Sequence, residues 1–125
     1  MASLSDVRAL TISDENAAST TRIAAAARPT AAFTLANTTH ANGTARNVTV
    51  TTTGTGDNEK TVTVVGTDVF GDSLTEVITS TSSAETVAGS SLFLTITSAT
   101  CSAQYAANVS VGSGSVCAQA VEGAN

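Results

Sequence analysis

Two aspartates in the stretch GTDVFGD are the residues whose type and spacing most readily suggest chemistry. Asp68 and Asp72, together with Asp57 or Glu76, could offer carboxylate oxygens to a calcium ion. Calcium usually takes about six or more oxygens at defined spacing, and the sequence has neither an EF-hand nor a nonapeptide repeat. Asp also caps backbone amides in turns, and Gly supplies the positive φ that tight hairpins need. We therefore interpret GTDVFGD as a hairpin turn and expect no metal site.

Other reactive side chains are few. His40 is the single histidine, and no serine lies in a G-x-S-x-G pattern. A nucleophilic triad needs a base beside the nucleophile and an acid that orients the base. Because turn-forming residues surround His40, we expect it to face solvent. We predict no catalytic residue and no cofactor, and we expect that the protein is not an enzyme.

Cys101 and Cys117 are the only thiols, and neither lies in a C-x-x-C pattern typical of zinc sites. We expect each to pack as a small apolar side chain. A disulfide between them stays open as an alternative, because their segments could form neighbouring strands. Such a bond would form only outside a reducing cytoplasm.

Short β-strands are the elements that would carry these residues. The 125 residues include 23 Thr and 15 Ser, whereas only 12% are charged and 3% aromatic. Thr is β-branched and suits a pleated strand, and alternation of apolar and polar residues marks half-buried strands. We expect strands at 31–37, 45–53, 60–66, 74–80, 91–100, 108–115 and 116–121, the last two joined by a turn at Gly112 and Gly114. Seven short strands predict an all-β fold, a β-sandwich of Ig-like or jelly-roll-like type.

An N-terminal arm, residues 1–35, is predicted to precede the sandwich domain at residues 36–125. Residues 13–30 could form a helix that Ser13 caps and Pro29 ends. Its apolar side would consist of Ile23 and small alanines, which bury too little area to hold a helix in isolation. We expect a short helix or an extended arm that packing on a partner orders.

The charge and hydropathy of the chain argue against nucleic-acid and membrane partners and suggest an acidic one. The formal charge is −5, whereas a nucleic-acid binder needs clustered Lys and Arg. No apolar run approaches the roughly 20 residues of a membrane span, and no signal-peptide pattern is visible; we expect a chain kept in a cytoplasm, without nucleic-acid or membrane partners. Residues 1–46 carry four arginines against three acidic residues, and the remainder carries one lysine against seven. The N-terminal part therefore suits an acidic neighbour, although scatter among few charges is the alternative.

Four phrases of the sequence together resemble a protein family. They are RNVTVTTTG, KTVTVVGTDVFGDSLTEVITS, SLFLTITSATCS and NVSVGSGS, within residues 45–115. They resemble small Thr/Ala-rich virion proteins of tailed bacteriophages, from which the two cysteines are a departure. The matching positions are Val64, Gly66, Thr67, Asp68, Gly71, Thr75, Glu76, Ile78, Val109, Val111 and Gly112.

The resemblance implies a structural role in the virion. The first expectation is a capsid decoration, or cement, protein that binds and stabilises the lattice of the major capsid protein, on the capsid surface of a particle assembled in the bacterial cytoplasm. A head–tail neck or tail component is the alternative, and an Ig-like glycan-binding or adhesion module is a second one. Repetition on a lattice favours a homo-oligomer such as a trimer. We predict that the arm makes the partner contacts, through Arg8, Arg22, Ile23, Arg28, Pro29 and Phe33.

Overall fold

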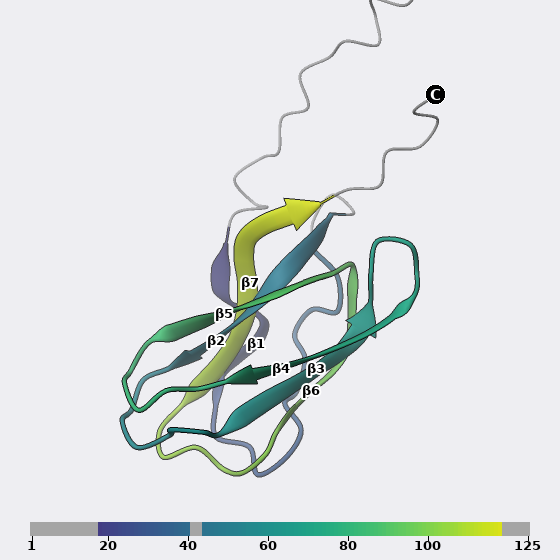
Figure 1. Ribbon diagram of the computed structural model, residues 1–125. Coiled ribbons are helices and arrows are strands. Elements are labelled where there is room, and N and C mark those ends of the chain that lie inside the picture. The colour runs from purple at the N-terminus through teal and green to yellow at the C-terminus, as the bar shows by residue number, and fades with distance from the viewer. Residues whose placement is uncertain (1–17, 41–43, 119–125) are drawn as a thin grey trace, which may run out of the picture.

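The structure, a computed structural model, describes residues 18–40 and 44–118. Within these ranges the chain forms seven strands in two antiparallel sheets, ordered β1-β7-β2-β5 and β4-β3-β6 (Figure 1). This arrangement confirms the predicted all-β sandwich. No described helix is long and apolar enough to cross a membrane. The strands are β1 (Ser19–Ala27), β2 (Ala45–Thr52), β3 (Thr61–Thr67), β4 (Ser73–Thr79), β5 (Thr86–Phe93), β6 (Thr95–Cys101) and β7 (Val109–Ala118).

The strand order differs from that of an immunoglobulin constant domain. There the fourth strand belongs to the four-stranded sheet and the last strand to the three-stranded sheet. Here β4 lies at the edge of the three-stranded sheet, and β7 lies inside the four-stranded sheet between β1 and β2. The first and last described strands are therefore paired with each other.

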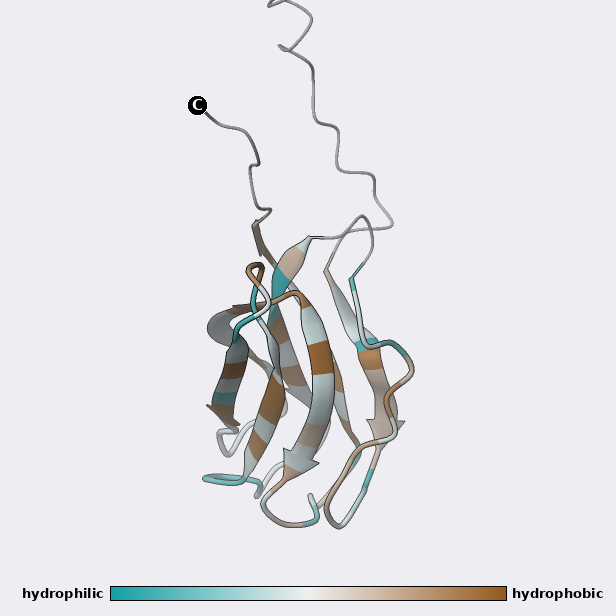
Figure 2. Cartoon of the chain, turned by 90° about the vertical axis from the view of Figure 1, so that its right-hand side faces the viewer, coloured by the Kyte–Doolittle hydropathy of each residue, from teal (hydrophilic) through white to brown (hydrophobic). Residues whose placement is uncertain are grey.

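The core lies between the two sheets because side chains alternate along each strand. In β3, Val62 and Val64 are fully buried while Thr61 and Thr63 are half-buried. Brown, hydrophobic bands recur along the strands with paler bands between them (Figure 2). The largest fully buried side chains are Tyr105, Phe93, Ile23, Ile96, Val48, Val50, Val62, Val64, Val109, Val111 and Asp57.

Residues 45–50 of β2 and 109–114 of β7 are buried on both faces of the sheet, and two glycines make this possible. A Cβ on Gly112 would lie 2.0 Å from the carbonyl oxygen of Ser19, and one on Gly114 would lie 2.3 Å from Oδ1 of Asn47. The start of β1 and the side chain of Asn47 thus pack directly on the backbone of β7. The predicted hairpin turn at these glycines is wrong, because β7 runs without interruption from Val109 to Ala118.

Two other strand predictions also need correction. Residues 31–37 do not form a regular strand; they run beside β6 with a single bridge between Ala32 and Thr100. The predicted strand 91–100 is divided at Leu94, whose amide donates to the carbonyl oxygen of Thr67 at 2.7 Å. Its first part belongs to β5 and its second part to β6, so this one apolar run contributes a strand to each sheet.

The described part of the predicted arm lies within the sandwich. Residues 19–27 form β1, which is extended rather than helical and pairs with β7. Residues 28–40 then cross to the other sheet and follow the free edge of β6. Along this path the amide of Phe33 donates to the carbonyl oxygen of Ala99 at 2.9 Å, and that of Ala36 to the carbonyl oxygen of Ile23 at 2.7 Å. Residues 1–17 lie outside the described residues.

Candidate partner-binding surface

The end of β1 and the segment after it form an open hollow of about 470 Å³, which we call the alanine hollow. The pairing of β1 with β7 shifts register between Ala24 and Ala27. Consequently Ile23 and Ala24 are buried, whereas the three following alanines are exposed. The lining residues are Ala25, Ala26, Ala27, Arg28, Pro29, Ala32, Phe33, Thr34 and Ala36.

Hydrogen bonds to the β6–β7 connection fix one wall of the alanine hollow. Nε of Arg28 donates to the carbonyl oxygen of Tyr105 at 3.0 Å, and Nε2 of Gln104 donates to the carbonyl oxygen of Arg28 at 2.9 Å. The thiol of Cys101 donates to the carbonyl oxygen of Pro29 at 3.4 Å. Since these contacts hold the backbone, the shape of the alanine hollow is largely preformed.

Three of the predicted partner-binding residues, Arg28, Pro29 and Phe33, meet in this hollow. Phe33 lines the hollow and belongs to the core, with 7% of its surface exposed. Ile23 is also a core residue, 1% exposed, so its side chain presents almost no surface to a partner. Arg22 is half-buried on β1 outside the hollow lining. Arg8 lies outside the described residues.

A partly buried ion pair between Asp57 and Lys60 contacts the same β6–β7 connection that holds Arg28. Oδ1 of Asp57 lies 2.8 Å from Nζ of Lys60 and accepts the amide of Ala106 at 2.7 Å. Burial alone would raise the pKa of Asp57, but the hydrogen bonds from Lys60 and Ala106, with the charges of Lys60 and Arg28, outweigh burial and lower it. Asp57 therefore stays ionised, and with two cations beside it this region keeps a net positive charge.

The GTDVFGD stretch is the hairpin turn that the sequence predicts. Oδ1 of Asp68 accepts the amides of Phe70 at 2.8 Å and Asp72 at 3.0 Å, and the amide of Asp68 donates to the carbonyl oxygen of Asp72 at 2.9 Å. Gly71 has a φ of 86°, which suits glycine. Asp68 is thus occupied as a turn cap. Across residues 18–40 and 44–118, no group of three or more His, Cys, Asp or Glu could hold a metal ion.

Phe70 at the tip of this turn was missed by the sequence analysis. It is 79% exposed, whereas Phe33 and Phe93 are core residues. An aromatic residue between two turn-forming aspartates was the available signal, because a tight turn projects the side chain at its tip away from the sheet. Exposed aromatic side chains are typical anchors of protein interfaces.

The prediction that His40 faces solvent is wrong. His40 is 5% exposed, and neither ring nitrogen has a hydrogen-bond partner among the described residues. Burial, together with the charges of Arg46 and then Arg22, lowers the pKa of His40 to about 4. The imidazole is therefore neutral at pH 7 and fills space beside two arginines.

Both cysteines are free thiols. Cys101 is buried in β6 of the three-stranded sheet, as expected of a small apolar side chain, and Cys117 is half-buried in β7 of the four-stranded sheet. The two strands are not neighbours, which removes the premise of the alternative disulfide. Burial raises the pKa of Cys101.

No protein-family model, curated protein or solved structure matches this chain.

Proposed function

We propose that this chain is a structural virion protein of a tailed bacteriophage, a capsid decoration protein that binds the lattice of the major capsid protein. One observation carries the proposal: the alanine hollow is lined by alanine, proline and phenylalanine side chains with one threonine and one arginine, rather than by a converging set of polar side chains. Such a surface suits contact with another protein. A decoration protein stabilises a particle by binding the assembled lattice and leaving its unassembled subunits unbound.

The short side chains support this role. Ala and Thr lose little rotamer freedom when a neighbour packs on them, and they allow two backbones to approach closely. In the described part of β1, the exposed residues after Ile23 and Ala24 are all alanines. Burial of this end of the strand against another protein is therefore entropically inexpensive.

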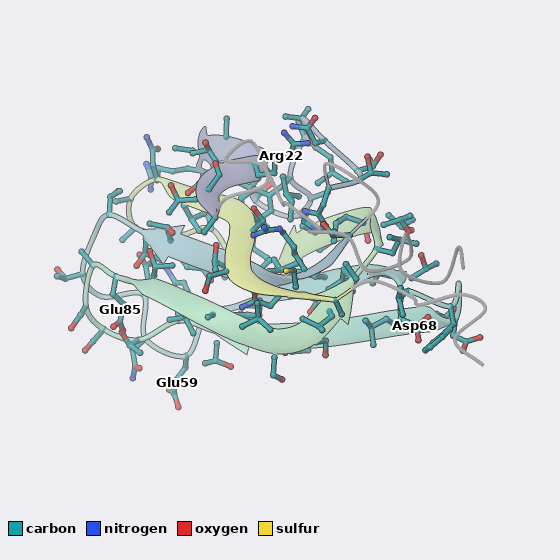
Figure 3. All side chains as sticks on the ribbon, turned by 90° about the horizontal axis from the view of Figure 1, so that it is seen from above. Arg22, Glu59, Asp68 and Glu85 are labelled. Carbon is teal, nitrogen blue, oxygen red and sulfur yellow. The ribbon has the colours of Figure 1, made fainter. Side chains whose placement is uncertain are left out.

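The capsid contact is proposed at the end of the sandwich where β1 begins. Arg22 lies on β1 at this part of the molecule, and its carbonyl oxygen is held by Nδ2 of Asn37 at 2.7 Å (Figure 3). Arg8 precedes it in the chain. Together the two arginines would contact an acidic surface of the major capsid protein, and such contacts mainly increase association rate and specificity.

Binding to capsids that carry no decoration protein tests this assignment. Purified protein is mixed with them, and bound copies per capsid are measured by co-sedimentation. A chain without residues 1–17, and the variant Arg22→Gln, should each reduce occupancy at subsaturating protein, whereas Glu59→Gln should not, because it neutralises one exposed charge elsewhere. Full occupancy by the shortened chain and by Arg22→Gln would refute the proposed contact.

A neck or tail component would share the same sandwich but occur in few copies, so copy number in purified virions separates it from decoration. A glycan-binding module would need a platform of several exposed aromatics. Among the described aromatic residues Phe33, Phe93 and Tyr105 are buried and Phe70 alone is exposed. This arrangement favours a protein partner over a sugar.

A further inference from the structure

Phe70 is presented by a turn that is rigid before any partner binds. The carboxylate of Asp68 holds two amides of the turn, and the amide of Gly71 donates to the carbonyl oxygen of Asp68 at 3.1 Å. Because the backbone is already ordered, little conformational entropy remains to be lost when the ring is buried. A largely exposed phenylalanine on such a turn has the properties of an interface anchor.

The alanine hollow has the size and chemistry to receive this ring. A cavity of roughly 150 Å³ lined by apolar side chains already holds benzene, and the alanine hollow measures about 470 Å³. Its lining includes the nearly buried ring of Phe33 and the side chains of Ala26 and Ala32. An aromatic ring seated there would meet apolar atoms on several sides.

The charges around the ring and around the hollow are opposite. Phe70 stands between Asp68 and Asp72, and Asp72 is exposed. The hollow carries the exposed Arg28, and Lys60 and the buried Asp57 contact the β6–β7 connection that holds it. The turn is thus acidic and the hollow is basic. Asp68 lies on the opposite side of the molecule from Glu59 and Glu85, so the turn is a separate acidic feature (Figure 3).

The ring and the hollow belong to different parts of one chain. Phe70 lies between β3 and β4 of the three-stranded sheet, whereas the alanine hollow begins at the end of β1 in the four-stranded sheet. One copy can therefore offer its turn to a second copy while its own hollow stays accessible. Contacts between two different patches of identical chains build rings or open chains.

We propose that the Phe70 turn of one copy docks into the alanine hollow of a second copy, with Asp72 facing Arg28 across the contact. The proposal concerns contact between copies of this chain and holds whether or not the chain decorates a capsid. A contact of this size is expected to be weak in solution and to become effective where a lattice or a ring places copies side by side.

Sedimentation of the full chain over a concentration series reaching about 1 mM tests the proposal. The average mass of the unaltered protein should rise with concentration. Phe70→Ala removes the ring, and Ala26→Glu fills the hollow and repels the acidic turn; each should weaken association by at least about tenfold. Val77→Thr is the matched control, because Val77 is also exposed and apolar but lies on β4 away from both patches. Thermal unfolding confirms that each variant is folded.

A mixing experiment separates specific docking from general stickiness. Phe70→Ala keeps an intact hollow and Ala26→Glu keeps an intact turn, so the mixture should form heterodimers more strongly than either variant associates with itself. A protein that stays monomeric throughout the series would overturn the proposal. Association that survives both substitutions, or a mixture that stays monomeric, would overturn it equally.

Discussion

The carboxylate of Glu76 accepts a hydrogen bond from the backbone amide of Ser90 at 2.7 Å, and this contact joins the edge strands of the two sheets. The amide of Ser91 donates to the same carboxylate, with its nitrogen 3.2 Å from Oε2. Glu76 also occupies the space above Gly89, where a Cβ would lie 2.4 Å from Oε2. Unpaired edge amides invite pairing with another chain. Glu76 satisfies two of them on β5 and thereby closes one side of the sandwich.

Replacing Glu76 by alanine should lower the free energy of unfolding by about 1–3 kcal/mol, because the exposed amide of Ser90 and the partly buried amide of Ser91 lose their charged acceptor. Glu76→Gln keeps one oxygen acceptor and should cost less. Urea denaturation measures the loss, and light scattering detects the aggregation expected from the uncovered edge of β5. Glu59→Ala is the control at an exposed acid. If Glu76→Ala is as stable as this control, the structural role given to the carboxylate is wrong.

Gly112 is predicted to tolerate no side chain. A Cβ there would lie 2.0 Å from the carbonyl oxygen of Ser19 and 2.5 Å from the carbonyl carbon of Thr20. Both contacts are to backbone, so Gly112→Ala must displace the start of β1, with an expected loss of about 1–3 kcal/mol of stability. In the variant Gly112→Ala, backbone amides of β1 should exchange faster than in the unaltered protein, and the change should be larger in β1 than in β3. Unchanged protection of β1 would contradict this packing.

The single histidine gives an unambiguous NMR signal. His40 should titrate in the folded protein with a pKa of about 4, below its ordinary value of 6.5. The unfolded chain therefore binds the proton first as pH falls. The stabilising contribution of neutral His40 is complete above about pH 6.5 and is lost as pH falls from there to about 4. His40→Gln should flatten the dependence of the urea midpoint on pH in this window. In the unaltered protein, an NMR titration of His40 near pH 6.5 would show that the ring is solvated and would contradict its burial.

The two thiols should differ in reactivity. Cys117 is half-buried, whereas Cys101 is buried with a raised pKa, and the thiolate is the reactive form. A thiol reagent at neutral pH should therefore modify Cys117 first and Cys101 only slowly. In denaturant without reductant, both thiols should react at once. In the folded variant Cys117→Ser, only the slow reaction of Cys101 should remain. Fewer than two reactive thiols in denaturant would indicate a disulfide and contradict the sheet assignment of these strands.

Local patterns predicted the three consecutive strands β2, β3 and β4 and the turn between the last two. The alternation of Val and Thr placed β2, β3 and β4 within about two residues, since burial of one face imposes a period of two. The turn from Asp68 to Asp72 followed from residue types that act on their own backbone. Such features depend on neighbours in sequence, which is why they were predictable.

Features that depend on distant contacts were not predictable. Gly112 and Gly114 indicated a turn, but their role is to admit Ser19 and Asn47, which lie far away in the sequence. Likewise, the alanine run of β1 gave no strand signal, because its extended form is imposed by pairing with β7.

The candidate site was only partly predictable. Composition drew attention to Arg28, Pro29 and Phe33, and these do line one hollow. Their convergence depends on the crossing of residues 28–40 between the sheets, which no local pattern reveals. The exposure of Phe70 and the burial of His40 likewise follow from tertiary packing.

Cryo-electron microscopy of the virion whose genome encodes this chain tests the central claim most directly. The proposed function predicts density for a seven-stranded sandwich at repeated positions over the capsid, with the end that carries Arg22 against the major capsid protein. Density confined to the neck or tail, or a virion without this chain, would contradict a decoration role.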